Sequence, residues 1–173
     1  METVLVPDSQ AEVEIARMMR EYGAYILRLC FVSLGDRGLA EEAAQDTFVK
    51  AYRGWASFRE DSSEKTWLSA IAVNTCKDMR RRNWFKVRSR HVSLEDVPEP
   101  SVPFDERDDT LVKAVMLLPH RYREAIVLHY YQGLPVSDVA AILKLKPTGV
   151  YTRLRRGQQM LKPVLEGWYR NEE

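Results

Sequence analysis

Apolar residues recur every three or four positions along most of the chain, a spacing that places them on one face of a helix. The first such segment follows Ser9 and stops at the turn residues 35–38. The second covers residues 39–55, and the third begins near residue 65 and ends in a run of arginines. Their predicted inner stripes are Met18, Tyr22, Tyr25, Ile26, Leu29 and Cys30; Ala40, Ala44, Thr47, Phe48, Ala51, Tyr52 and Trp55; and Leu68, Ile71, Ala72, Thr75 and Met79.

Proline and glycine divide the carboxyl-terminal part of the chain into four shorter helical segments. We expect helices over residues 107–118, 120–132, 135–143 and 148–167, which Pro119, Gly133 and Pro147 separate. Pro135 suits a first helical turn, because the N–H that proline lacks has no helical partner there. No segment alternates apolar and polar residues as a strand would. The fold class is therefore predicted to be all-α.

A proline-bearing segment separates the two sets of helices. Residues 97–103 (VPEPSVP) hold three prolines in seven residues and almost no residues suited to a core. Proline keeps such a segment extended and stiff. We therefore predict two small helical domains, residues 1–91 and 107–173, joined by an extended, acidic, proline-containing linker over residues 92–106.

The distribution of charge is more informative than its sum. The net charge of the 173-residue chain is only +1 at pH 7, which says nothing about a nucleic-acid partner. Residues 77–90, however, carry seven Lys or Arg against the single acid Asp78, and residues 144–162 are basic with no acid. Between them, residues 95–109 are strongly acidic. Two basic patches separated by an acidic linker favour binding of nucleic acid at two places.

Several classes of function find no support in the sequence. Cys30 and Cys76 lie among apolar neighbours at no metal-ligand spacing, so we expect two buried core residues and no metal. His91, His120 and His129 belong to no catalytic motif, and no phosphate-binding loop is present, so neither an enzyme, a cofactor nor a small-molecule substrate is expected. Without a signal peptide or an apolar stretch long enough to span a membrane, a cytoplasmic location is expected.

The most informative pattern is a helix, a short turn and a second helix near the carboxyl terminus: PVSDVAAIL, KLKP and TGVYTRLRR over residues 135–156. Placing Val150, Leu154 and Leu161 inside puts one polar face of the last helix outside. A face with two arginines and several hydroxyls suits a recognition helix in a DNA major groove, where Arg binds guanine and hydroxyls bind phosphates or base edges. A solvated helix face is the alternative. The face comprises Thr148, Tyr151, Thr152, Arg155, Arg156 and Gln159.

The turn of this motif contains Lys144 at the position where glycine is common. A left-handed backbone at a non-glycine residue costs roughly 1 kcal/mol. We therefore expect either a left-handed Lys144 or a different turn geometry.

The third helix and the loop before it interleave aromatic and basic residues. Single-stranded nucleic acid is bound in this way, by stacking on aromatic rings and by cations along its backbone. Two simpler interpretations stay open, namely that Trp67 anchors the core and that Arg80, Arg81 and Arg82 form a solvated run. The candidate strand-binding residues are Phe58, Arg59, Lys65, Trp67, Asn74, Lys77 and Arg81, with Arg80 and Trp84 nearby.

The outer face of the second helix is a candidate protein-docking surface. It presents Glu42, Gln45 and Asp46 beside Val49, an apolar residue predicted to be exposed. Taken alone, this pattern is better explained by a solvated amphipathic face.

In combination, these segments resemble the extracytoplasmic-function (ECF) sigma factors of bacterial RNA polymerase. AEEAAQDTFVKAY (residues 40–52) resembles their polymerase-clamp-binding helix, and KTWLSAIAVNTCKDMRR (residues 65–81), preceded by Phe58 and Arg59, resembles their minus-ten recognition segment. LPHRYREAIVLHYYQGL (residues 118–134) and the helix-turn-helix resemble their region four. The resemblance extends over about residues 14–165.

The resemblance implies a role for each surface. Glu42, Gln45, Asp46 and Val49 would bind the clamp of core RNA polymerase. The loop of residues 58–64 would capture a flipped minus-ten base, with Asn74 and Lys77 on the opened strand. Tyr151, Thr152, Arg155 and Arg156 would contact the minus-thirty-five duplex. Thr148-Gly149 stands where the family usually has Gly-Thr, and Tyr151 replaces a common basic residue, so the resemblance does not extend to the exact minus-thirty-five sequence.

The partners implied are core RNA polymerase, through its clamp and flap, promoter DNA, and a cognate anti-sigma factor that in some cases is membrane-bound and holds the sigma factor at the membrane. One alternative stays open from the helix-turn-helix alone: a free-standing transcriptional regulator, with residues 1–91 as a sensor or dimerisation domain. It would bind a palindromic duplex without polymerase.

Overall fold

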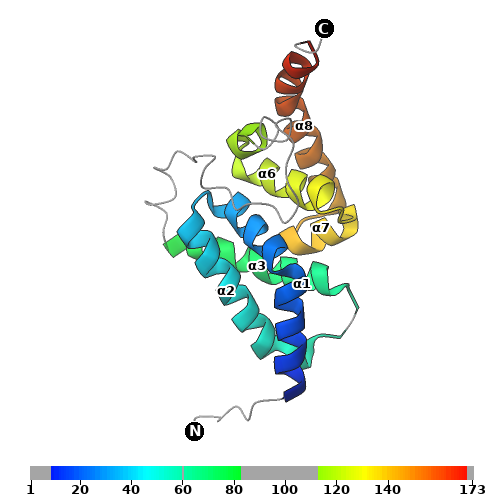
Figure 1. Ribbon diagram of the computed structural model, residues 1–173. Helices are drawn as coiled ribbons and strands as arrows, with labels where there is room; N and C mark the ends of the chain where they lie inside the picture. Colours follow the sequence, from blue (N-terminus) through cyan, green and yellow to red (C-terminus); the bar gives the residue numbers. More distant parts are fainter. Residues whose placement is uncertain (1–8, 60, 83–112, 171–173) are drawn as a thin grey trace.

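The computed structural model describes residues 9–59, 61–82 and 113–170, and these residues form helices and turns with no strand. The predicted all-α class is thereby confirmed. We call residues 9–82 the amino half and residues 113–170 the carboxyl half. In Figure 1 the amino half lies below and the carboxyl half above, with the end of the last helix projecting upward. The predicted linker, residues 92–106, lies outside the described residues.

Three helices make up the amino half: α1 (Ser9–Leu34), α2 (Arg37–Gly54) and α3 (Glu64–Arg82), with a short 3-10 turn η1 (Trp55–Ser57) after α2. Gly35, with a φ of 67°, ends α1. The Asp36 side chain then accepts a 2.7 Å hydrogen bond from the backbone N–H of Leu39 and so caps α2. This cap satisfies a donor that the first turn of a helix leaves without a partner.

All three helices bury one face in a common core. Phe31 of α1, Phe48 of α2 and Leu68 of α3 are each buried there. Cys30 and Cys76 are buried free thiols, which confirms their predicted core role. Burial of apolar area is the main force that stabilises such a bundle.

The carboxyl half contains α6 (His120–Ile126), α7 (Val136–Leu143) and α8 (Pro147–Arg170). Residues 113–117, just before Leu118, are also helical. The predicted helix over residues 120–132 is continuous through Tyr131, but its second part is not α-helical. There the backbone widens into a π-helical turn, η3 (Val127–Tyr131), in which the Gln132 N–H donates to the Val127 carbonyl at 2.9 Å. A π turn shifts the direction of the side chains that follow it, which the apolar spacing does not encode.

Helix α8 is longer than predicted. It continues to Arg170, and Pro163 lies inside it without ending it. Residues 147–161 pack against α6 and α7 through Val150, Leu154 and Leu161, all buried as expected.

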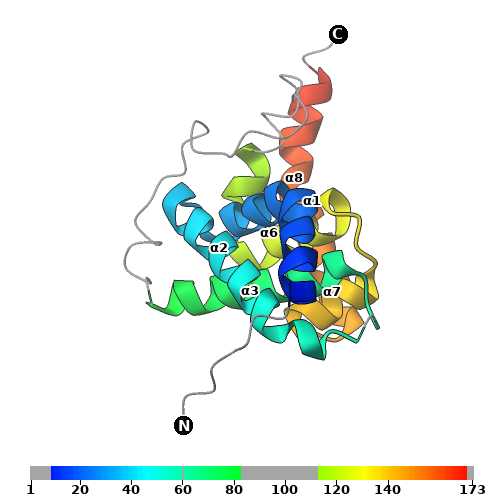
Figure 2. The same cartoon turned by 60° about the horizontal axis from the view of Figure 1, so that its bottom comes forward.

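The two halves pack directly against each other. Helix α7 lies against α3, and α6 lies against α1. Figure 2 shows the same adjacency from a second side, with α7 beside the first turns of α3. The sequence predicts two domains but contains no sign of this contact, because the residues that meet are far apart in the chain.

Candidate nucleic-acid interface

The outer face of α8 is fully open to solvent. All six residues predicted for duplex binding are exposed, and Tyr151 has 61% of its surface accessible. Because the opposite stripe of α8 is buried, the helix is held rigidly while this face stays free. We call this set the duplex surface: Thr148, Tyr151, Thr152, Arg155, Arg156 and Gln159.

Lys144 forms the turn that aims α8. Its φ of 55° and ψ of 49° are left-handed, as the sequence suggested for this position. The Leu145 N–H donates to the Ala140 carbonyl at 2.9 Å and closes the end of α7. This geometry satisfies carbonyls that the last turn of a helix would leave unpaired. The motif is therefore a helix-turn-helix, with α8 in the place of a recognition helix.

Helices α6 and α8 cross closely at Gly157. A Cβ placed there would lie 2.8 Å from Cγ1 of Ile126 and 3.6 Å from Cβ of Tyr122. Only the absent side chain allows this approach, so Gly157 sets the separation of the two helices. The sequence offered no signal for it, because a glycine within a helix has many possible explanations.

Two tyrosines contact polar side chains of α8. Arg156 donates from Nη1 to the hydroxyl of Tyr122 at 3.3 Å, and Gln158 donates from Nε2 to the hydroxyl of Tyr130 at 2.7 Å. Tyr122 is buried in α6, whereas Tyr130 lies in the π turn and is exposed. Tyr122 thus restricts the positions of Arg156, a role that sequence reasoning missed because the two residues lie 34 positions apart.

The amino half carries a group of aromatic rings between α2 and α3. Phe58 stacks on Trp67 with ring centroids 4.6 Å apart, and Trp55 packs 5.7 Å from Phe58. All three rings are half-buried, and Arg59 beside them is exposed. Trp67 therefore packs against the core, as one interpretation expected, and also supports Phe58 at the surface.

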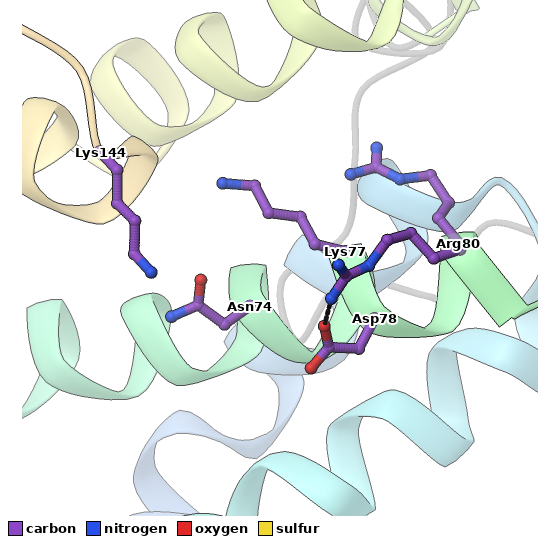
Figure 3. A pocket seen from close by; sticks show the side chains of 6 residues that line it. Asn74, Lys77, Asp78, Arg80 and Lys144 are labelled. Atoms are coloured by element: carbon purple, nitrogen blue, oxygen red, sulfur yellow. Dashed lines mark hydrogen bonds and ion pairs between the residues drawn. The ribbon is translucent and has the colours of Figure 1, made fainter.

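Polar and basic side chains continue from this group along α3. Asn74, Lys77 and Arg81 line a cleft of about 620 Å³ together with Asp78, Arg80 and Lys144. Figure 3 shows Lys144, from the end of α7, pointing across the cleft toward Asn74. Arg81 also pairs with Asp78 of its own helix. We call the set predicted for strand binding the strand surface: Phe58, Arg59, Lys65, Trp67, Asn74, Lys77 and Arg81.

Lys65 lies apart from the cleft, under the carboxyl half. Its Nζ donates to the Gln132 carbonyl at 2.8 Å and lies 4.7 Å from the centre of the Tyr25 ring. The structure thus brings Phe58 and Trp67 together and groups Asn74, Lys77 and Arg81 at the cleft. Lys65 is engaged in a contact between the halves.

The candidate docking face on α2 is accessible. Glu42, Gln45 and Val49 are exposed, and Val49 has 47% of its surface accessible, while Asp46 is half-buried. We call these four residues the α2 surface. An exposed apolar residue flanked by acidic and amide groups is suited to a protein partner with a complementary basic rim.

A buried carboxylate lies where the halves meet. Glu124 of α6 is 2% exposed, and its Oε1 lies 3.0 Å from Nε2 of His120 and 3.9 Å from Nη2 of Arg80. Burial raises the pKa of Glu124, while the nearby cations, Arg80 foremost, act to lower it. Burial, with Arg80 next, lowers the pKa of His120 to about 3, so this imidazole is neutral at pH 7. Because His120 is uncharged at pH 7, it does not form a salt bridge with Glu124 at this pH.

Within residues 9–59, 61–82 and 113–170, no group of His, Cys, Asp and Glu side chains is arranged to hold a metal ion. In the same ranges, no helix is long and apolar enough to cross a membrane.

Two family models match the chain, one in each half. The family model for Sigma-70 region 2 matches residues 18–86, and that for Sigma-70, region 4 matches residues 108–161. RNA polymerase sigma factor YlaC of Bacillus subtilis is 33% identical over 155 residues, which cover 86% of this chain and 90% of the relative. ECF RNA polymerase sigma factor SigW of Bacillus subtilis is 30% identical over 158 residues, covering 83% and 84%.

Solved structures share the fold. The sigma factor RpoE from Bartonella quintana, in complex with the anti-sigma factor NepR, superposes with a TM-score of 0.72 at 25% identity, covering 88% of this chain and 97% of that one. CnrH, in complex with the cytosolic domain of CnrY, superposes with a TM-score of 0.67 at 21% identity. Two region models in order and relatives matched over most of their length identify this chain as a member of the ECF family of RNA polymerase sigma factors.

Proposed function

We propose that this chain binds core RNA polymerase and directs promoter-specific initiation of transcription through its three surfaces. The α2 surface binds the polymerase clamp, the strand surface binds the opened minus-ten element, and the duplex surface binds the minus-thirty-five element. The observation that carries the proposal is their presence, in this order, on one chain that belongs to the ECF family.

The division of work follows from the size of the basic surfaces. Each offers few cations, so each alone binds DNA weakly and with strong dependence on salt. Docking on polymerase fixes the distance between them. The second contact then becomes effectively intramolecular, and the two modest affinities multiply.

Strand opening draws on binding energy at the aromatic group. Flipping a base out of the stack costs a few kcal/mol. Stacking of a base on an aromatic ring returns roughly 1–3 kcal/mol. Phe58, held in place by Trp67 at 4.6 Å, is the ring best placed to supply this contact.

We also propose a cognate anti-sigma factor as a partner, since the solved relative RpoE is in complex with the anti-sigma factor NepR. A regulator anchored in the membrane would hold this chain there until release.

Transcription reconstituted from purified components tests the proposal. Core RNA polymerase with this chain should initiate at specific promoters of a genomic library, and polymerase alone should not. Charge reversal of the α2 surface, Glu42→Lys with Asp46→Lys, should abolish both polymerase binding and initiation. Glu41→Lys is the matched control, because Glu41 is exposed on the same helix but pairs with Arg37 instead.

The result also separates this function from the free-standing regulator. A regulator would bind a palindromic duplex tightly without polymerase, and the α2 substitutions would leave that binding unchanged. Such an outcome, with no initiation on any promoter of the library, would overturn the proposal.

A further inference from the structure

An arginine that the duplex surface does not include lies at its edge. Arg121 is exposed in the first turn of α6, and its guanidinium carbon lies 4.7 Å from the centre of the Tyr122 ring. A cation at this distance from an aromatic ring is attracted to it, which restricts the positions that the cation adopts. The same tyrosine accepts the 3.3 Å hydrogen bond from Nη1 of Arg156. One ring therefore holds two guanidinium groups, which come from two different helices.

Both cations act on the hydroxyl of Tyr122. The hydrogen bond from Arg156 is the main cause that lowers the pKa of this hydroxyl, and the positive charge of Arg121 contributes to the same shift. Tyr122 itself is fixed, since it is buried next to Gly157, where α6 and α8 cross. The two arginines are therefore held close to one buried side chain, although they are far apart in the sequence.

No carboxylate among the described residues of the carboxyl half neutralises these two arginines. Glu124 is buried at the junction of the halves, and Glu166 pairs with Lys162. Asp138, the third acid of this part of the chain, accepts the hydrogen bond from Thr66 of α3. Two cations that are held near each other without an anion repel, and an anion placed between them removes that repulsion. The pair is thus suited to an anionic ligand.

The position of the pair on the helix-turn-helix indicates which anion it meets. An α-helix with its side chains is about 10–12 Å across, and the major groove of DNA is about 12 Å wide. A recognition helix therefore fills the groove, and residues at its sides face the sugar–phosphate backbone that forms the groove wall. Arg156 lies at the side of α8 next to α6, because the following residue, Gly157, meets Ile126 of α6. Arg121 lies on that side too, since Tyr122 contacts both arginines.

We propose that Arg121 and Arg156 form one binding site for a single phosphate of the DNA backbone, at the edge of the minus-thirty-five element, with Tyr122 as its positioning residue. The planar fork of N–H donors on a guanidinium group matches the oxygens of a phosphate. The inference rests on the proposed function, because that function places duplex DNA on α8. It adds Arg121, which lies outside the helix-turn-helix, and it assigns Arg156 to the backbone and not to a base.

A phosphate contact differs from a base contact in what its loss changes. It orients the protein and strengthens binding but holds no information about the base sequence. Its loss should therefore weaken binding to every duplex by the same factor. Each lost phosphate should also lower the slope of log K against the logarithm of salt concentration by about 1. These two readouts identify a phosphate site whatever the promoter sequence is.

The first experiment measures duplex binding by the full chain at low salt. Fluorescence anisotropy follows two labelled duplexes of equal length, one with the minus-thirty-five region of a promoter recovered from the genomic library and one with a shuffled sequence. Arg121→Ala should weaken binding to both duplexes about three- to tenfold, because hydrogen bonds to a charged group are lost. Arg20→Ala is the matched control, since it removes an exposed arginine from α1 of the amino half and should change both affinities little.

Two results would overturn the site. The first is an Arg121→Ala variant that binds both duplexes as tightly as the parent chain. The second is a loss of affinity confined to the promoter duplex, which would indicate a base contact. Circular dichroism first confirms that each variant is folded.

The salt dependence tests whether the two arginines share one phosphate. The double variant, Arg121→Ala with Arg156→Ala, should lower the slope by about 1, as expected for one phosphate. An unchanged slope contradicts a phosphate contact, and a decrease of about 2 means that each arginine neutralises a phosphate of its own, which contradicts the shared site. Arg121→Lys should keep the slope of the parent chain, because it keeps the charge, and should lose part of the affinity, because it lacks the planar fork.

The positioning role of Tyr122 is tested through Arg156. Tyr122→Phe should weaken duplex binding about threefold in the parent chain and clearly less in the Arg156→Ala chain, because the hydroxyl acts mainly through that arginine. An equal loss in both chains would overturn the positioning role.

These results are separate from those that test the proposed function. A chain that initiates at promoters, but whose Arg121→Ala variant binds both duplexes as the parent does, contradicts the phosphate site alone. A chain that never initiates with polymerase contradicts the proposed function, whatever its affinity for duplex DNA.

Discussion

Helices α3 and α8 are both basic and both proposed to bind DNA, yet the fold treats them differently. Helix α8 buries one stripe, centred on Val150 and Leu154, and exposes the duplex surface opposite to it. Helix α3 buries one face in the amino half and then meets the carboxyl half on another, through Lys65 and Thr66. A basic sequence therefore does not by itself make an accessible DNA-binding surface.

The two helices are proposed to bind different forms of DNA, and this bears on how exposed each one is. Duplex DNA is present throughout the genome, and weak contact with it helps a protein search. Single-stranded DNA exposes stacked bases that any aromatic group would bind without sequence preference.

The largest expected effect is on the stability of the carboxyl half. Gly157→Val should lower the free energy of unfolding of the carboxyl half by about 3 kcal/mol, because its side chain would overlap Ile126 and force α6 and α8 apart. Chemical unfolding followed by circular dichroism measures it. Gly149→Ala on the same helix is the control, since its Cβ would lie 3.8 Å from Leu145, an ordinary contact, and alanine favours helix. Equal stability of the two variants would contradict this account.

Acidification should weaken the junction of the halves. The folded protein holds His120 neutral, with its pKa lowered by burial to about 3, whereas the unfolded chain protonates near 6.5. Stability should therefore fall as the pH drops below 6.5, by about 2 kcal/mol at pH 5. The raised pKa of Glu124 acts in the opposite direction and offsets part of this loss. The charged groups facing His120 are Glu124 and Arg123 of α6, Arg80 and Lys77 of α3, and Arg153 of α8.

Urea unfolding at pH 5 and pH 7 tests this assignment. His120→Gln cannot take up a proton, so the variant should lose most of the difference between the two pH values. Identical differences in the variant and the parent protein would show that other groups cause the pH dependence.

Matched substitutions in the two DNA-binding helices test the comparison itself. Arg155→Ala should weaken duplex binding about tenfold, both for the free chain at low salt and for the polymerase complex, because one base or phosphate contact is lost. Lys77→Ala should impair promoter opening by the complex but change duplex binding by the free chain little, because Lys77 lies outside the duplex surface. Each variant is assayed as the free chain and in the polymerase complex, and the four results are compared. A free chain equally sensitive to both substitutions would remove the distinction between the helices.

The smallest effect concerns the positioning of Arg156. Tyr122→Phe keeps the ring in the core and removes only the hydroxyl that Arg156 bonds at 3.3 Å. Initiation at promoters that depend on the minus-thirty-five element should fall about threefold, because a modest hydrogen bond is lost. Stability should change little. If Tyr122→Phe and Arg156→Ala have additive effects on initiation, Tyr122 acts independently of Arg156.

Much of this protein follows from its sequence. The spacing of apolar residues determined the three helices of the amino half, the end of α7 and the inner stripe of α8, because helical period and burial are local properties. The same period placed Arg155 and Arg156 outside and suggested the left-handed Lys144. The proposed roles of the surface residues stay predictions, since exposure is necessary for them but does not prove them.

Only the tertiary structure decided which surfaces are free. The π turn over Val127–Tyr131, the close crossing at Gly157 and the bond between Tyr122 and Arg156 depend on how helices approach one another. The contact of α3 with the carboxyl half joins residues 67 and 72 positions apart, such as Lys65 with Gln132 and Thr66 with Asp138. No periodicity marks such pairs, because polar contacts between domains rest on a few side chains and not on a repeated pattern.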